Sequence, residues 1–97
     1  MIESFGDRTT SDLFHGIASS RVRRLPPQIR TSALYKLDCI NAARALEDLR
    51  SPPGNRLEAL KGNYHGFHSI RINQQWRIIF RWEDSSAYDV QIIDYHA

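Results

Sequence analysis

The sequence has little cysteine and no long hydrophobic run, and each absence excludes a class of protein. Cys39 is the only cysteine among 97 residues, which excludes an internal disulfide framework and favours a reducing compartment. No apolar run approaches the roughly 18 residues that span a bilayer. Residues 1–5 also lack the basic start and apolar stretch of a secretion signal. We therefore expect a cytoplasmic protein with no membrane partner.

Motifs for common cofactors are missing as well. The sequence contains no glycine-rich phosphate loop, no zinc-ligand spacing, and no serine or cysteine nucleophile in a recognisable setting. His65 and His68 stand three residues apart, but nothing near them in the sequence completes a metal site. We expect neither a metal nor a cofactor.

Charge is distributed unevenly along the chain. Residues 21–82 hold twelve basic and four acidic residues, a formal charge of +8, whereas residues 1–20 carry −2 and residues 83–97 carry −4. A basic middle of this kind indicates a polyanion or an acidic protein surface as partner, although a solvated charged face has the same composition. The length suits one compact domain, residues 1–97, with one modest core.

Two helices are expected in the N-terminal half. Residues 12–17 could form one or two turns, with a threonine or serine at positions 9–11 as the cap. Pro26-Pro27 suits the first turn of a second helix, where proline is tolerated. Two prolines and a glycine within residues 51–55 should end it. Apolar residues at spacings of three and four predict one buried stripe on this helix: Ile29, Ala33, Leu34, Leu37, Ile40 and Ala43.

Strands are expected before the helices and after the break. Residues 2–5, 56–60 and 69–72 each suit a short strand. In the clearest strand Trp76, Ile78, Phe80 and Trp82 fall on one side and Arg77, Ile79 and Arg81 on the other, while Tyr88, Val90 and Ile92 alternate in the last strand. We therefore predict an α+β protein, β-α-α-β-β-β, in which two N-terminal helices pack on one face of an antiparallel β-sheet.

A cluster of groups suited to phosphate chemistry is expected at one end of this sheet. Lys61 follows one strand, Arg71 and Arg77 lie on neighbouring strands, and Asp94-Tyr95-His96 closes the last strand. Histidine can transfer protons near neutral pH, arginine matches phosphate oxygens, and an aromatic ring can stack on a base. These groups suffice in kind for metal-independent RNA cleavage. The alternatives are that Arg77 merely covers the sheet and that Lys61 is a solvated loop residue.

A longer sequence pattern contains these residues. It comprises Leu60-Lys61-Gly62-Asn63, Gly66, the run from His68 to Asn73, Gln75-Trp76-Arg77, Phe80 and Asp94-Tyr95-His96. The pattern resembles the HigB toxins of bacterial type II toxin–antitoxin pairs, within the RelE/ParE superfamily, over essentially the whole chain. The segment from Arg50 to Glu58 is similar to the GraT subgroup of HigB-like toxins.

The resemblance implies a RelE/ParE-like fold and a ribosome-dependent mRNA endonuclease. A HigA-like antitoxin with a helix-turn-helix domain would neutralise it, and the complex would bind operator DNA. Carried over by position, Lys61 and Arg77 would stabilise the phosphate, and Asp94, Tyr95 and His96 would form the catalytic group, with His96 the first choice for proton transfer. Further residues are expected to contact RNA or the ribosome: Arg21, Arg23, Arg24, Arg71, Asn73, Gln75 and Arg81.

Three positions depart from the family pattern. Glu58 stands where some HigB toxins have histidine, Gln75 stands where some have asparagine, and Ala97 extends past the usual terminal histidine. A weak toxin is compatible with all three. The main alternative is a ParE-like toxin that binds and inhibits DNA gyrase without cutting RNA, because one fold serves both functions. The antitoxin, rather than ribosomal RNA, could also use the surface around Arg21, Arg23 and Arg24.

Overall fold

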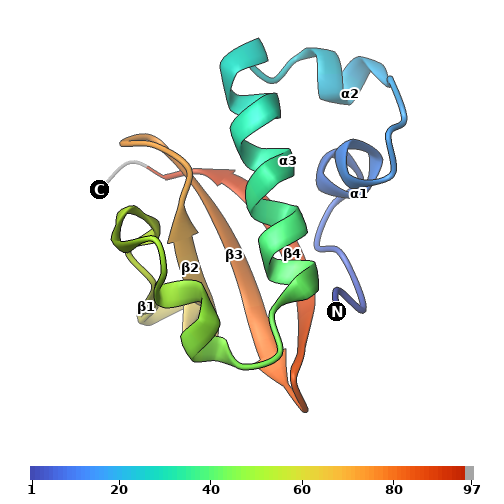
Figure 1. Ribbon diagram of the computed structural model, residues 1–97. Coiled ribbons are helices and arrows are strands. Elements are labelled where there is room, and N and C mark those ends of the chain that lie inside the picture. The colour runs from blue at the N-terminus through green and yellow to red at the C-terminus, as the bar shows by residue number, and fades with distance from the viewer. Residues whose placement is uncertain (96–97) are drawn as a thin grey trace.

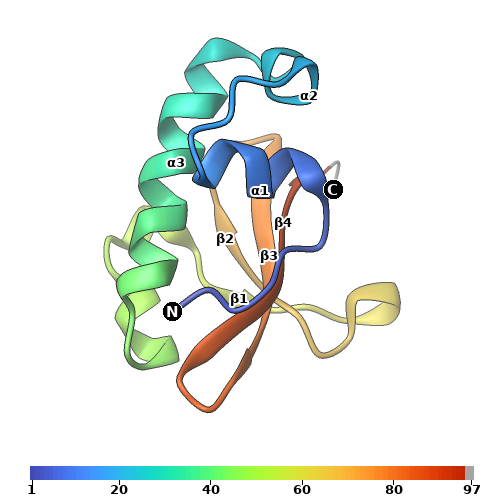
Figure 2. The same ribbon diagram turned by 90° about the vertical axis from the view of Figure 1, so that its right-hand side faces the viewer.

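A four-stranded antiparallel sheet, in the order β1-β2-β3-β4, forms the centre of the computed structural model, which describes residues 1–95 (Figure 1). α3 lies along one face of the sheet, and the loop that contains η3 lies on the other side (Figure 2). The elements in chain order are α1 (Arg8–Phe14), α2 (Ser20–Arg23), α3 (Pro27–Ala42), η1 (Leu46–Arg50), η2 (Pro53–Asn55), β1 (Glu58–Ala59), η3 (Gly62–Tyr64), β2 (His68–Arg71), β3 (Trp76–Glu83) and β4 (Ser86–Asp94).

The long helix α3 supplies the largest helical share of the core. It begins at Pro27, in the first turn where proline costs no hydrogen bond, and its stripe is buried at Ile29, Ala33, Leu37 and Ile40. These side chains pack against buried residues of the sheet. Burying a leucine or isoleucine stabilises the fold by about 1.5–3 kcal/mol, so this stripe fixes α3 on the sheet. The predicted helix is confirmed, but it ends at Ala42 rather than at the proline-rich break, and Leu34 is only partly buried.

The region before α3 contains two helices, so the expectation of two N-terminal helices in all is wrong. α1 begins at residue 8 because the Asp7 carboxylate accepts a hydrogen bond from the Thr10 backbone at 2.9 Å, rather than at residue 12 with a cap from positions 9–11. Ser19 caps the short α2 in the same way. The segment expected as a first strand makes two isolated parallel bridges to β4, Ile2 with Ala87 and Phe5 with Val90.

The two sides of β3 differ as the alternation predicts. Ile78 and Phe80 are fully buried beneath the helices, and Trp76 and Trp82 pack at the border of the same core. On the other side Arg77 and Arg81 flank Ile79, which is also buried. The predicted core side of this strand is confirmed.

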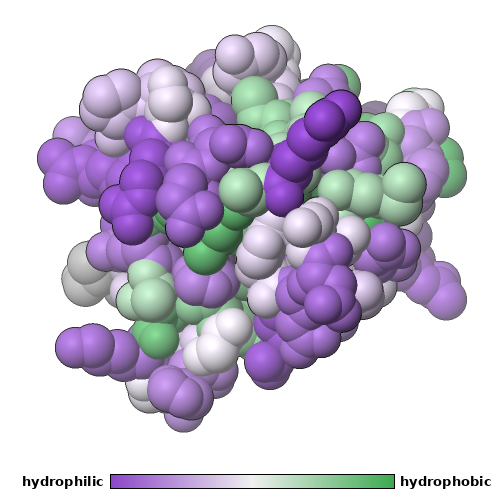
Figure 3. Space-filling model, turned by 60° about the horizontal axis from the view of Figure 1, so that its bottom comes forward, coloured by the Kyte–Doolittle hydropathy of each residue, from purple (hydrophilic) through white to green (hydrophobic). Residues whose placement is uncertain are grey.

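Seen from below in Figure 3, hydrophobic residues are visible as separate green areas among more extensive hydrophilic ones.

A bulge in β4 changes the alternation of that strand. Ile79 pairs with Gln91 while Arg81 pairs with Tyr88, so β4 holds one extra residue between these two pairs. Asp89, within the bulge, has a φ of +53°. As a result Ala87, rather than Tyr88, is fully buried on the core side with Val90 and Ile92. The expectation that Tyr88 shares this face with Val90 and Ile92 is wrong.

The segment between α3 and β1 is held by one buried amide. The Asn55 side chain is 1% exposed; its amide nitrogen donates to the backbone carbonyls of Leu49 and Ser51, and its amide oxygen accepts from Lys36 of α3. β1 begins at Glu58 rather than at residue 56, because Arg56 has a left-handed backbone with a φ of +46°. The α+β class and the antiparallel sheet are confirmed. No helix within residues 1–95 is long and apolar enough to cross a membrane.

Candidate active site

Arg77 is the centre of a polar cluster on the sheet face opposite α3. Its Nη1 donates to Glu58 Oε1 at 2.5 Å and to Ser69 Oγ at 3.0 Å, and its side chain is only 12% exposed. Glu58 pairs with Ser69 in the β1–β2 ladder, and Arg71 pairs with Arg77 in the β2–β3 ladder. Three neighbouring strands therefore contribute to one small area and hold the guanidinium in a fixed orientation.

The end of β4 adds an aromatic ring to this cluster. The Arg77 guanidinium carbon lies 4.8 Å from the centre of the Tyr95 ring, within range of a cation–π contact. The Tyr95 backbone N–H donates to the Gln75 carbonyl at 2.7 Å, and Gln75 Nε2 donates to Asp94 Oδ2 at 3.1 Å. The β2–β3 turn and the end of β4 are thus tied together beside Arg77.

The turn between β2 and β3 positions Gln75. Asn73 Oδ1 accepts hydrogen bonds from the backbone N–H groups of Gln75 and Trp76, both at 2.8 Å. A side-chain oxygen that satisfies two turn amides in this way fixes the local backbone. Asn73 therefore has a structural role whether or not it contacts RNA.

Arg71 makes this end of the sheet electropositive. It stands directly opposite Arg77, and like charges in facing positions of a ladder repel each other. Within residues 1–95 its Nε is buried and has no hydrogen-bond partner, a state that costs free energy until an acceptor arrives. Glu58 offsets one of the two positive charges. The remaining positive charge suits a phosphate oxygen.

Glu58 and Ser69 are the members of this cluster that sequence reasoning missed. Ser69 is two residues before Arg71 on one strand, so strand alternation could have placed it on the same face. The location of Glu58 beside Arg77 depends on how β1 pairs with β2, which the sequence did not predict. In the sequence, Glu58 stood out only as a departure from the HigB pattern. Its side chain is 50% exposed, so a substrate can reach the carboxylate.

The predicted cluster of Lys61 with Arg77 and the C-terminal residues is divided in the structure. Lys61 directly follows Leu60, whose N–H donates to the Phe67 carbonyl next to the start of β2 at His68. Arg77 pairs with Arg71, at the opposite end of β2. Lys61 is exposed. Asp94 and Tyr95 lie at the Arg77 end, and His96 is outside the described residues.

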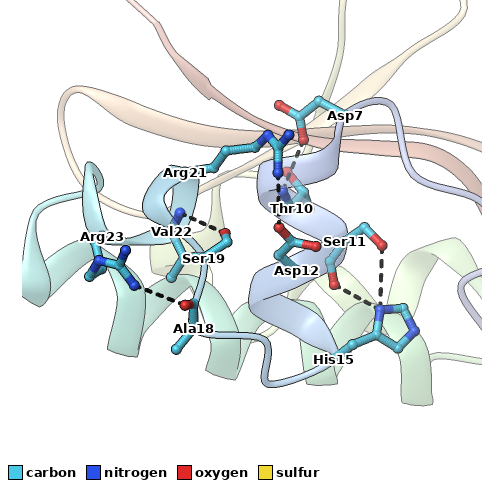
Figure 4. Close-up of polar contacts among 10 residues, drawn as sticks. All are labelled: Asp7, Thr10, Ser11, Asp12, His15, Ala18, Ser19, Arg21, Val22 and Arg23. Atoms are coloured by element: carbon cyan, nitrogen blue, oxygen red, sulfur yellow. Dashed lines mark hydrogen bonds and ion pairs between the residues drawn. The ribbon is translucent and has the colours of Figure 1, made fainter.

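Arg81 and the α2 arginines lie apart from this cluster. Arg81 stacks on the Phe67 ring at 4.3 Å and pairs with Asp89 at 3.4 Å, on the same sheet face but nearer to Lys61. Arg21, Arg23 and Arg24 lie at α2, on the helical side (Figures 1 and 4). The predicted RNA-binding residues therefore form three areas: the Arg77 end of the sheet, the surroundings of Arg81 on the same face, and α2 on the helical side.

The two central histidines differ in environment. His65 is exposed, whereas His68 is partly buried beside Phe80, and this burial lowers the pKa of His68 below its usual 6.5. Within residues 1–95, no group of three or more histidine, cysteine, aspartate or glutamate side chains could hold a metal ion.

Comparison with known proteins identifies the family. Residues 3–96 match the HigB-like toxin family, described as the RelE-like toxin of type II toxin–antitoxin system HigB. The chain belongs to this family. Toxin HigB-1 of Vibrio cholerae serotype O1 is 46% identical over 72 residues, which cover 74% of this chain and 76% of that protein. Endoribonuclease HigB of Proteus vulgaris is 31% identical over 96 residues, covering 99% of this chain and 100% of that protein.

Solved structures agree on the fold. A chain in the heterotetrameric YoeB-YefM toxin–antitoxin complex from Staphylococcus aureus superposes with a TM-score of 0.60 at 15% identity, covering 100% of this chain and 99% of that one. At this identity the likeness shows the fold alone. The resemblance to HigB toxins and the RelE-like fold are thus confirmed, while the GraT-like subgroup stays a prediction.

Proposed function

We propose that this HigB-like toxin is an endoribonuclease that cuts mRNA on translating ribosomes, and that the Arg77 end of the sheet holds the scissile phosphate. The observation that carries the proposal is the pair of arginines in facing positions of neighbouring strands, with Arg77 held by Glu58, Ser69 and Tyr95. A relative aligned over its whole length is named an endoribonuclease, which supports the same activity.

This cluster, together with His96 next in the sequence, would supply the groups for each part of metal-independent RNA cleavage. The ribose 2′-oxygen attacks phosphorus, the bond from phosphorus to the 5′-oxygen breaks, and the products are a 2′,3′-cyclic phosphate and a 5′-hydroxyl. Arg77 and Arg71 would bind the non-bridging oxygens, whose negative charge grows in the pentavalent state. Preorganised donors aimed at such charge are worth about 10²–10³ in rate each.

Proton transfer requires a base and an acid. Glu58, a half-exposed carboxylate beside Arg77, is in position to accept the 2′-hydroxyl proton. His96, one residue beyond Tyr95, would donate a proton to the leaving 5′-oxygen, since histidine can do so near neutral pH. Tyr95 would stack on a base next to the scissile bond, and Asp94 would orient the C-terminal end through Gln75.

The remaining basic residues on this face would bind RNA. Lys61 and Arg81 lie towards the other end of β2 and would contact the phosphates of RNA further along the sheet. The partners that we propose for this chain are a HigA-like antitoxin, the ribosome with its mRNA, and operator DNA bound through the toxin–antitoxin complex. All of these are in the cytoplasm.

Mapping of RNA ends after induction tests this function. The wild type, an Arg77→Ala and His96→Ala double variant, and an Arg50→Ala control at an exposed position of η1 are induced in separate strains. We expect new 5′-hydroxyl ends within translated messages for the wild type and the control, and none for the double variant. Growth arrest without such ends, together with inhibited DNA supercoiling, would instead support the gyrase-binding alternative.

A further inference from the structure

The helical side of the molecule carries an apolar cavity that the nuclease chemistry does not use. Its volume is about 270 Å³, and it lies between α1, the loop that follows α1, α2 and α3. Leu13, Ile17, Val22 and Leu34 line it together with Arg30. Ile17, on the loop, is 53% exposed, so the apolar lining of the cavity reaches the protein surface.

The wall of this cavity is held in place by polar contacts. Arg21 pairs with Asp12 across α1 and α2 at 3.6 Å, and Arg23 Nη1 donates to the Ala18 carbonyl at 2.9 Å (Figure 4). Ser19 caps α2, and the His15 ring bonds to the Ser11 carbonyl at 2.7 Å. The loop is therefore fixed at both ends, and a ligand would meet a preformed site at low entropic cost.

Arg30 adds a buried hydrogen-bond donor to the apolar cavity. Its Nε is buried and, among the described residues, has no hydrogen-bond acceptor. A buried donor left without a partner is costly, and a carboxylate satisfies a guanidinium best. The α2 segment beside the cavity adds positive charge through Arg21, Arg23 and Arg24, of which Arg21 pairs with Asp12. The site thus combines an apolar cavity with a cationic wall and rim.

The residues that line the cavity favour a peptide over RNA as its ligand. Single-stranded RNA is bound by aromatic stacking and by phosphate contacts, yet the cavity is lined by aliphatic side chains and contains no aromatic ring. An amphipathic protein segment with an aliphatic anchor and a nearby aspartate or glutamate matches both the apolar lining and Arg30.

We propose that this cavity is the docking site for an acidic amphipathic segment of the antitoxin, with one aliphatic side chain inserted beside Ile17 and Leu34 and one carboxylate on Arg30. The proposal rests on the proposed function in assuming an antitoxin partner. It assigns Arg21, Arg23 and Arg24 to the rim of a protein interface rather than to ribosomal RNA.

Binding measurements with the purified HigA-like antitoxin encoded beside this chain test the docking site. The variants are Ile17→Glu, which places a carboxylate at the exposed edge of the cavity, and Arg30→Met, which removes the guanidinium. The control is Tyr35→Glu, on α3 but outside the lining residues and 62% exposed. We expect both cavity variants to raise the Kd by about tenfold or more, and the control to change it by less than about twofold.

Two parallel measurements separate this proposal from the nuclease. Each variant is assayed for mRNA cleavage without antitoxin, and for sedimentation with ribosomes. Retained cleavage with weakened antitoxin binding is the expected result, and it also shows that the variants fold. Unchanged antitoxin binding in both cavity variants, or an equal loss in the control, overturns the docking site. Weakened ribosome binding with unchanged antitoxin binding overturns it in favour of RNA. Absence of cleavage by the wild type would refute the nuclease and leave the binding result to decide the docking site.

Discussion

Replacement of Arg77 by lysine removes the guanidinium fork and keeps the positive charge. In the wild type one side chain bonds to Glu58 and Ser69 and lies over the Tyr95 ring at the same time. The lysine ammonium is a point charge without a planar face, so it cannot keep all three contacts. If Arg77 stabilises the phosphorane, loss of its fork should slow cleavage by about 10²–10³, which corresponds to about 2.7–4 kcal/mol of transition-state stabilisation.

The same substitution should leave the fold nearly as stable as before. The lysine ammonium still lies beside Glu58, which is half exposed, so the main loss is the hydrogen bond to Ser69, which is worth about 0.5–1.5 kcal/mol. The assay is single-turnover cleavage of mRNA bound to purified ribosomes, accompanied by urea unfolding, with Arg50→Lys as the matched control. A cleavage rate within about threefold of the wild type would refute the assignment of Arg77. So would a loss of stability large enough to leave Arg77→Lys unfolded under assay conditions.

Three further outcomes are expected from the structure. Asn55→Ala should lower the free energy of unfolding by about 1–3 kcal/mol in urea titrations, because the buried Leu49 carbonyl and the partly buried Ser51 carbonyl lose their donor. Thr10→Val should have a similar cost of about 1–3 kcal/mol, since the buried Thr10 hydroxyl accepts from the Ile92 backbone N–H. Burial lowers the pKa of His68 below 6.5, so the unfolded chain binds more protons near that pH and stability should fall as the solution is acidified from about pH 7 to about pH 5. His68→Gln should flatten this fall in urea midpoints relative to His65→Gln; an equally steep fall in both variants would contradict the burial of His68.

The features that sequence reasoning predicted are those set by local periodicity. The stripe on α3 repeats every three or four residues, and the two sides of β3 alternate without interruption, so burial follows directly from the pattern. The arginines of β2 and β3 could likewise be placed on one side of the sheet. Membership of the HigB-like family could be predicted because the matching motifs extend over the whole chain.

The features that it missed depend on pairing between distant segments. Because of the bulge at Asp89, Ala87 rather than Tyr88 lies on the buried face, and no residue type in that strand predicts the bulge. The contact between Glu58 and Arg77 requires β1 to pair with β2, and β1 has only two residues. The cavity beside Arg30 requires α2 to fold back over α1 and α3, which a four-residue helix does not encode locally.

Cleavage of one mRNA by the purified wild-type chain, compared with and without bound ribosomes, tests the central claim most directly. We predict cuts with 5′-hydroxyl ends in the ribosome-bound message and little or no cleavage of the free message over the same time. Equal cleavage of both messages would contradict the ribosome dependence. An intact message in both reactions, from a folded chain that still binds ribosomes, would contradict the nuclease itself.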